Sequence, residues 1–311
     1  MYNFEISPFS KYKIRSEYPV YIEEGVTSIG SSTFDDQYIS EIKIPNTVRY
    51  IGAKAFAYSS LYFVYIPDSV TYFDDSAFEN STLLEYINIP ILLTYIGNLC
   101  FSGCTSLKSI TFYEELTNIG ERAFYGCYSL TSINFINCNK LNTIEKGAFY
   151  RCESLTSIKI PDKVDTIQGS AFRKCCSLKE IELPKQLTII ENSVFCYCCK
   201  LESIKLPEKI TKISKYAFMH CNSIETIHIP KDVEIIEDYA FLYCYKLKSF
   251  SVDEKNQYYS TIDGILTSIE KNAIYNYPPN KDLKSYEIPN SIVNLSQYTF
   301  CYCLNLKHIT I

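Results

Sequence analysis

The chain has 311 residues, of which 47% are hydrophobic and 21% are charged, and its formal net charge is −5. This composition is typical of a globular protein and argues against disorder. The mild negative charge includes no basic cluster, so a nucleic-acid partner is not expected, and no apolar run reaches the roughly 20 residues of a spanning helix, so no membrane insertion is expected.

The first 19 residues differ from the regular chain that follows. Lys11, Lys13 and Arg15 interrupt their apolar residues, which excludes the core of a signal peptide. The sequence alone therefore predicts an intracellular protein. We interpret residues 1–19 as an N-terminal cap.

Residues 20–311 consist of one repeated unit. Residues 160–183 read IPDKVDTIQGSAFRKCCSLKEIEL, and the same pattern recurs mostly every 23 residues. A unit of this size cannot bury its apolar side alone, so the units must stack. The repeat predicts a leucine-rich repeat solenoid, α/β or mainly β, of about 12 rungs, with a parallel sheet on a concave face and short helical turns opposite.

Two columns of the repeat predict the buried ladder of the coil. A phenylalanine recurs at one position, and a cysteine recurs three residues later as a small filler whose thiol donates to a loop carbonyl. The central members are Phe124, Phe149, Phe172, Phe195, Phe218 and Phe241, with Cys127, Cys152, Cys175, Cys198, Cys221 and Cys244.

One rung, at residues 253–289, is longer than the others. It contains Asp263-Gly264, a pair typical of tight hairpin turns, between two short apolar runs. The pattern predicts a hairpin that projects from the solenoid.

The repeat resembles a known family. The unit Ile-Pro-x-x-Val-x-x-Ile-x-x-x-Ala-Phe-x-x-Cys-x-x-Leu-x-x-Ile-x-Ile is similar to the leucine-rich repeat of the BspA-like surface antigens of bacteria and protists. This resemblance implies a right-handed, curved solenoid with adhesion or protein-binding roles, often at the cell surface, and it supplies no catalytic residues.

The remaining cysteines and histidines do not assemble into a site by spacing. Cys196-x-Cys198-Cys199 superficially resembles a metal motif, but neighbouring residues of such a coil point to different sides, so no metal site and no cofactor is predicted. His220 beside Cys221 has no carboxylate in a fixed frame, and no enzyme activity is expected. Cys176 and Cys199 leave open a redox role for exposed thiols.

The outward positions of the predicted strands are the candidate binding residues. They vary from rung to rung, and they are either a solvated sheet face or a platform that binds a protein or glycan of unknown identity. Tyrosines near the predicted helical turns could add anchors. The candidates are Asn134, Lys159, Glu180, Glu182, Lys205 and His228.

The sequence therefore predicts a non-enzymatic interaction or adhesion module that binds a macromolecule through its concave face. The alternative is a scaffold protein that associates end to end. That alternative depends on Leu306–Ile311, a final strand with free backbone groups.

Overall fold

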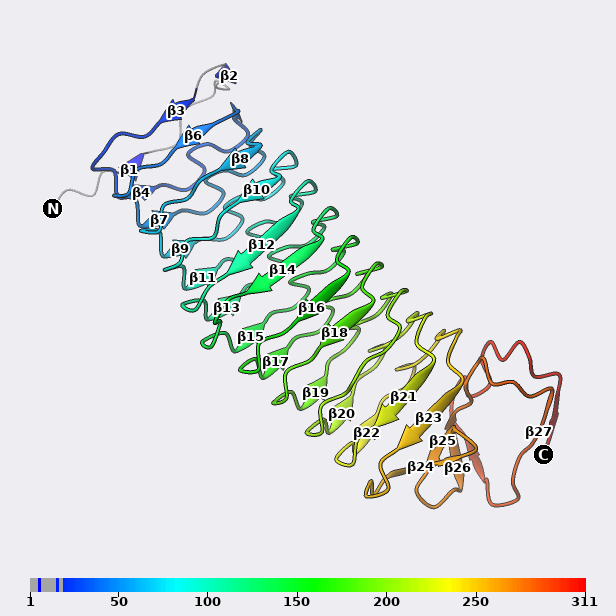
Figure 1. The fold of residues 1–311 in the computed structure, drawn as a ribbon. Coiled ribbons are helices and arrows are strands. Elements are labelled where there is room, and N and C mark those ends of the chain that lie inside the picture. Colours follow the sequence, from blue (N-terminus) through cyan, green and yellow to red (C-terminus); the bar gives the residue numbers. More distant parts are fainter. Residues whose placement is uncertain (1–4, 7–14, 17–18) are drawn as a thin grey trace.

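The computed structural model describes residues 5–6, 15–16 and 19–311, and its chain forms an elongated coil (Figure 1). The coil has about 13 turns, one more than the sequence predicted. Residues 5–6 and 15–16 pair with strands of the first predicted rung. The rest of the predicted cap lies outside the described residues.

Each regular turn contributes a short strand to a first parallel sheet. Residues at the same repeat position in consecutive turns pair in register, such as Ile119 with Ile144 and Ile144 with Ile167. The sequence did not predict this second layer of pairing. Its strands are β1 (Glu5–Ile6), β4 (Ser28–Ile29), β7 (Tyr50–Ile51), β9 (Tyr72–Phe73), β11 (Tyr95–Ile96), β13 (Asn118–Ile119), β15 (Thr143–Ile144) and β17 (Thr166–Ile167), continued by β19 (Ile189–Ile190), β20 (Lys212–Ile213) and β22 (Ile235–Ile236).

The predicted Leu-x-x-Ile-x-Ile strands lie on another side of the coil and pair two by two, all parallel. Apolar residues point inward and polar residues outward, as in β18, where Ile181 is buried between exposed Glu180 and Glu182. The pairs are β2 (Arg15–Ser16) with β5 (Tyr38–Ile39), β3 (Val20–Tyr21) with β6 (Ile42–Lys43), β8 (Phe63–Val64) with β10 (Tyr86–Ile87), β12 (Ser109–Phe112) with β14 (Ser132–Phe135), β16 (Ser157–Lys159) with β18 (Glu180–Glu182), β21 (Thr226–Ile229) with β23 (Ser249–Val252), and β27 (Ser285–Glu287) with β29 (His308–Thr310).

The long rung contains the hairpin expected at Asp263-Gly264. β24 (Tyr259–Ile262) pairs antiparallel with β25 (Ile265–Ser268), which pairs with β26 (Ala273–Asn276), and β26 pairs parallel with β28 (Asn294–Leu295). The expectation that this hairpin projects is wrong, because every residue of β25 is buried. Leu266 joins the main core, so the hairpin packs into the coil as part of its wall.

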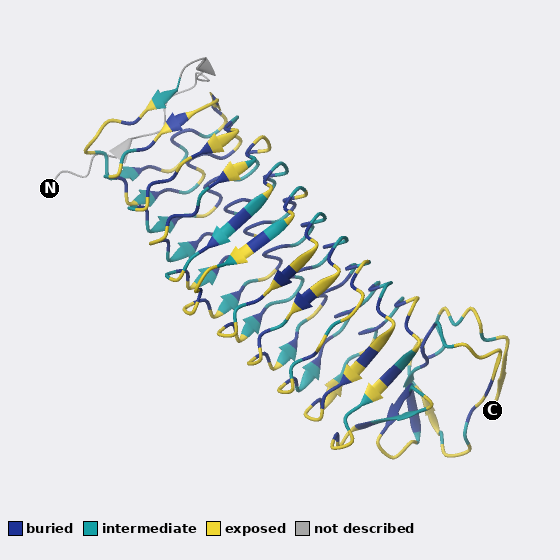
Figure 2. Ribbon diagram, viewed as in Figure 1, coloured by how far each residue is buried: buried dark blue, intermediate teal, exposed yellow. Residues whose placement is uncertain are grey.

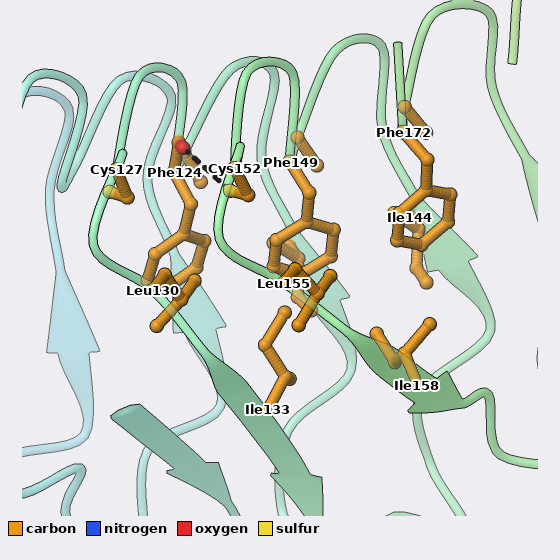
Figure 3. Close-up of a cluster of buried hydrophobic side chains, with 14 of the residues drawn as sticks. Phe124, Cys127, Leu130, Ile133, Ile144, Phe149, Cys152, Leu155, Ile158 and Phe172 are labelled. Atoms are coloured by element: carbon orange, nitrogen blue, oxygen red, sulfur yellow. Dashed lines mark hydrogen bonds between the residues drawn. The ribbon is translucent and has the colours of Figure 1, made fainter. Parts of the chain in front are cut away.

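The main core is a continuous stack of side chains along the coil. In Figure 2, buried segments of the ribbon, in dark blue, recur from turn to turn. Phe149, Phe172 and Phe195 are each fully buried. Consecutive rings stack nearly parallel, with centroids 5.5 Å apart for Phe149 and Phe172 and 6.1 Å apart for Phe172 and Phe195. Figure 3 shows how the ladder continues from Phe124 through Phe172, above Leu130, Leu155 and Ile158.

The segment around each ladder phenylalanine is a pair of tight turns, and the predicted short helical turn is wrong. The N–H groups of Ser170, Phe172 and Lys174 donate to carbonyl groups of the next rung, at Asn192, Val194 and Cys196. The intervening N–H groups donate three residues back within the same rung. Because every second backbone N–H group donates to the next rung, the consecutive hydrogen bonds of a helix, from each N–H to the carbonyl four residues back, cannot form.

Two residues in each of these turns have a left-handed backbone. They lie two positions before and two positions after the ladder phenylalanine, for example Ser170 (φ 61°) and Lys174 (φ 60°) around Phe172. This conformation costs an L-residue with a side chain about 1–2 kcal/mol. Ser, Asn, Asp and Gly are common at these positions in the first half of the coil, whereas Tyr and His predominate from Tyr197 onward. Nowhere does the described chain contain a helix long and apolar enough to cross a membrane.

Candidate binding site on the strand face

The outward residues of the Leu-x-x-Ile-x-Ile strands form one surface, which we call the strand face. Parallel pairing places Ser157 beside Glu180 and Lys159 beside Glu182, so equivalent residues of adjacent rungs lie next to one another. Asn134 on β14 and His228 on β21 are exposed in the same way. All six predicted binding residues are therefore exposed to solvent.

Five of the six candidates meet in one shallow depression. A hollow of about 430 Å³ extends over four rungs and is open to solvent. Its base includes Ile133, Ile158, Ile181 and Ile204. The candidates that line it are Asn134, Lys159, Glu180, Glu182 and Lys205. His228 lies outside it, and its Nδ1 is 2.9 Å from the hydroxyl of Ser251 on β23.

The charges in this hollow are partly paired. Lys159 Nζ lies 2.8 Å from a carboxylate oxygen of Glu182, and both side chains are well exposed. Donation of this hydrogen bond raises the pKa of Lys159 above its ordinary value, so the ammonium stays charged. Because the pair is exposed, it contributes little to folding stability. Lys205 has no ion-pair partner within the described part of the chain and remains available to a ligand.

The rung that carries Lys205 is the least regular of the strand face. Residues 201–207 form no strand, unlike the equivalent residues of the rungs on either side. Ile204 is half-buried, whereas Ile181 and Ile227 at the same repeat position are buried. A second hollow, of about 510 Å³, lies beside this rung and is lined by residues that include Leu183, Lys205 and Leu206. Apolar surface is therefore accessible next to the charged hollow.

An aromatic patch on the first rungs of the strand face was not singled out from the sequence. Phe63 and Tyr86 are cross-strand neighbours, and Tyr65 pairs with Lys43. The exposed fractions are 49% for Phe63, 55% for Tyr65 and 45% for Tyr86. Large aromatics at outward strand positions, where other rungs have Ser, Thr or Asn, are the signal that could have identified them.

The ladder cysteines form hydrogen bonds between rungs. In Figure 3, the thiol of Cys152 points at the carbonyl oxygen of Phe124, and the two atoms are 3.4 Å apart. Cys175, Cys198 and Cys221 repeat this contact with Phe149, Phe172 and Phe195 at 3.1–3.3 Å. Complete burial raises the pKa of each of these thiols well above its ordinary value. These thiols are therefore protonated and unreactive.

Cys176, one of the two cysteines for which the sequence leaves a redox role open, does not gain reactivity from its surroundings. Partial burial, followed by the neighbouring Cys199, raises the pKa of Cys176. This shift opposes the thiolate that a redox sensor needs. The described residues contain no group of His, Cys, Asp and Glu side chains that could hold a metal ion.

His220 lies within a stack of aromatic rings. Its imidazole is 4.3 Å from the ring of Tyr197 and 4.6 Å from that of Tyr243, measured between centroids. Burial lowers the pKa of His220, so the ring is neutral near pH 7. Cys221 next to it in sequence is fully buried. The two side chains therefore form no catalytic pair.

Comparison with solved structures shows the same fold in bacterial proteins. A leucine-rich repeat protein of Bacteroides ovatus is 24% identical, with 94% of this chain and 78% of that chain covered and a TM-score of 0.59. The pneumococcal vaccine antigen PcpA is 20% identical, with 99% of this chain and 84% of that chain covered and a TM-score of 0.58. A leucine-rich cell surface protein of Faecalibacterium prausnitzii is 22% identical, with 99% of this chain and 72% of that chain covered and a TM-score of 0.52.

The lengths of the matching proteins differ. The chain spans 48% of the length of a leucine-rich repeat protein of Eubacterium ventriosum, with 23% identity and a TM-score of 0.43. No protein of curated function matches the chain.

The repeat itself matches a family model in six copies. The model describes the BspA type leucine-rich repeat region, and it matches residues 9–85, 27–143, 75–198, 142–261 and 260–311. No enzyme family is indicated. With the model matching nearly the whole coil, the chain belongs to the BspA-type leucine-rich repeat family.

Proposed function

We propose that the protein is a non-enzymatic interaction module that holds a protein or glycan against its strand face. The observation that carries this proposal is the contrast between the two sides of the same strands. Inward positions repeat Ile or Leu in rung after rung, whereas the outward positions beside them change from Tyr65 to Asn134, Lys159, Glu182 and Lys205. Stability requires the inward repetition, but it does not require outward side chains that are individual to each rung.

The physical character of the strand face supports binding of a macromolecule. The exposed Phe63, Tyr65 and Tyr86 offer large, rigid apolar area of the kind that is enriched in interface hot spots. The hollow around Lys159, Glu182 and Lys205 adds charges of both signs, which favour one orientation of a partner over others. The two regions lie on one continuous surface, so an extended partner can contact both.

The binding test uses the full chain on an array of purified proteins and glycans. Reversing Lys159→Glu, Glu182→Lys and Lys205→Glu together changes the charged hollow. Replacing Phe63→Ser and Tyr86→Ser changes the aromatic patch. We expect one or both variants to lose at least about tenfold in affinity for the ligands that the wild type binds, about 1.4 kcal/mol.

The matched control reverses Lys231→Glu and Asp232→Lys, an exposed adjacent pair outside the hollow. This variant should bind as the wild type does. If both strand-face variants keep full affinity for every ligand found, the proposal is wrong.

We also propose display at the cell surface, in contrast with the intracellular location that the N-terminal residues predicted. The support is that structural relatives are described as a cell surface protein and a vaccine antigen. An antibody against the native coil should label unpermeabilised cells. Labelling that requires permeabilisation would contradict surface display.

End-to-end self-association is the second candidate, and it has one supporting observation. Val293 and Leu304 on the last described rungs are 77% and 72% exposed, and a second copy of the chain could cover these apolar side chains. Sedimentation velocity over a hundredfold concentration range tests it. Growth of the sedimentation coefficient with concentration would favour self-association, and a constant monomer would exclude it.

A further inference from the structure

The turn side of the coil contains a groove that the strand-face proposal does not involve. It lies over the last rungs, has a volume of about 480 Å³ and is open to solvent. Cys196, Met219 and Leu242 share one repeat position, directly after the ladder phenylalanine. Tyr216, Tyr239 and Tyr298 share the position two before it, and Tyr243 lies two after it. We call this surface the aromatic groove. It is lined by Arg173, Ser193, Cys196, Tyr216, Met219, Tyr239, Leu242, Tyr243 and Tyr298.

The tyrosines of the aromatic groove are ordered by stacking. The rings of Tyr216 and Tyr239 are nearly parallel, with centroids 5.4 Å apart, and Tyr298 follows at 5.3 Å. Tyr243 belongs to a second stack that contains His220. Lys215 Nζ lies 5.1 Å from the ring centroids of both Tyr216 and Tyr239. The rings are therefore held in place before any ligand arrives.

The backbone beneath these rings is strained. Tyr216, Tyr239, Tyr243 and Tyr298 have φ values of 61–65°, in the left-handed region. Ser170 and Ser193 occupy the same repeat position as Tyr216 with the same backbone conformation. The fold therefore does not need an aromatic ring there. The left-handed backbone recurs in every turn, but only in these rungs are the residues at this position tyrosines whose rings stack around one groove.

The polar side chains that line the groove are mainly hydroxyl groups. The nine lining residues include no Asp, Glu, Asn or Gln. The guanidinium of Arg173 lies over the ring of Tyr150, 5.8 Å from its centroid, and its Nε is shielded from solvent. The hydroxyls of Tyr239 and Ser193 already donate to Gln297 and Asn192, whereas those of Tyr216, Tyr243 and Tyr298 can donate to a ligand. A ligand that suits the groove therefore presents acceptors and apolar surface, and it needs few donors of its own.

A proline-rich segment has this chemistry. Proline lacks the backbone N–H, and in the polyproline II helix the carbonyl groups are free to accept hydrogen bonds while the rings provide apolar surface. Such segments bind to aromatic-lined grooves. The groove extends for roughly 15 Å along the coil, which accommodates about five residues at 3.1 Å each.

We infer that the aromatic groove binds a proline-rich segment of a partner protein in the polyproline II conformation. The hydroxyls of Tyr216, Tyr243 and Tyr298 donate to its carbonyl groups, and the open ring of Tyr216, beside the small Ser193, packs against a proline ring.

The experiment measures binding of a capped peptide of ten prolines to the full chain by isothermal titration calorimetry. We expect saturable binding, with a dissociation constant below about 1 mM. A capped Gly-Ser peptide of equal length and a linear glucose hexamer should not bind. If the peptide of ten prolines fails to bind, or if the Gly-Ser peptide or the hexamer binds equally well, the inference is overturned.

Variants locate the peptide on the molecule. Tyr216→Ser with Tyr239→Ser should weaken binding at least tenfold, and serine is already accommodated at this position in neighbouring rungs. Tyr216→Phe with Tyr239→Phe keeps the rings and removes two hydroxyl groups, so a smaller loss is expected. This second variant decides the question if the serine variant does not fold.

The matched control is Tyr58→Asn, which changes an exposed tyrosine with φ 55° on an early turn, far from the groove in the coil. It should bind the peptide as the wild type does. Unchanged binding by both groove variants, or equal loss in the control, would overturn the inference. The strand-face charge reversal should leave peptide binding intact, which separates this site from the proposed function.

Discussion

At the scale of single residues, the cysteine ladder shows how one side chain connects neighbouring rungs. The thiol of Cys198 donates to the carbonyl oxygen of Phe172 at 3.2 Å. On an early rung, the hydroxyl of Ser81 makes the equivalent contact with Phe56 at 2.7 Å. The position therefore requires a small side chain with a donor, and sulfur chemistry is not essential to it.

This equivalence predicts the order of two substitutions. Cys198→Ser keeps a donor for the Phe172 carbonyl, whereas Cys198→Ala removes it. We expect the serine variant to be more stable than the alanine variant by about 1 kcal/mol, the usual net worth of such a hydrogen bond. Urea unfolding measures the difference. An alanine variant as stable as the serine variant would show that the contact contributes nothing.

The sequence predicted the residues of the ladder, because burial of one column atop another requires the same side chain in every rung. Phe149, Phe172 and Phe195 are the repeated residues and also the stacked ones. The repeat spacing also predicted which residues point outward from the strands, but it could not predict which of them lie together in a binding site. Five candidates meet in one hollow, whereas His228 lies outside it and Phe63, Tyr65 and Tyr86 form a separate exposed patch, and repeat spacing alone does not distinguish these three outcomes.

At the scale of elements, the turns differ most from expectation. Ala171-Phe172 looks helical locally, because alanine favours a helix and no proline interrupts the segment. The structure instead uses carbonyl groups from the next rung as acceptors, and that contact lies more than 20 residues away in the chain. Local propensity cannot report such a partner. The two-residue strands of the first sheet were missed for a related reason, since they are too short to show alternation.

Close packing between turns predicts the effect of a glycine substitution. A Cβ at Gly97 would lie 2.5–2.6 Å from backbone atoms of Asp74 and Asp75, which cannot move independently of their rung. We expect Gly97→Ala to destabilise the protein by about 1–3 kcal/mol, as overpacking does. Equilibrium unfolding in urea provides the measurement.

Gly169→Ala is the matched control for this glycine. The nearest atom to its Cβ would be the Asn192 carbonyl oxygen at 3.1 Å, with the next contact at 3.9 Å. Its cost should be clearly smaller than that of Gly97→Ala. Equal costs would mean that rung spacing at Gly97 is looser than the structure shows.

At the scale of the whole molecule, the side chains that stabilise the coil point inward, and the side chains proposed to bind partners point outward. Inward columns form a continuous core from Ile22 to Leu266, followed by a small separate cluster around Tyr277 and Tyr286, while the strand face and the aromatic groove lie on different sides of the turns. A protein built in this way can change its binding residues rung by rung without altering the core.

Thiol reactivity reports whether this core is continuous. Ten of the 14 cysteines are buried, and only Cys176, Cys199, Cys301 and Cys303 are partly accessible. We expect iodoacetamide to modify the native protein at no more than these four, with the other ten reacting only as the coil unfolds. Mass spectrometry of digested protein identifies the sites. Rapid modification of Cys152 or Cys175 in native protein would contradict the packing.

The most direct test of the central claim is equilibrium unfolding of two variants against the wild type, followed by circular dichroism in urea. The claim is that inward columns hold the coil together and outward ones do not. Phe172→Ala should lose about 3–5 kcal/mol of unfolding free energy, whereas the reversal of Lys159, Glu182 and Lys205 should stay within about 0.5 kcal/mol of the wild type. A Phe172→Ala variant as stable as the wild type, or a charge reversal that costs as much, would contradict the account.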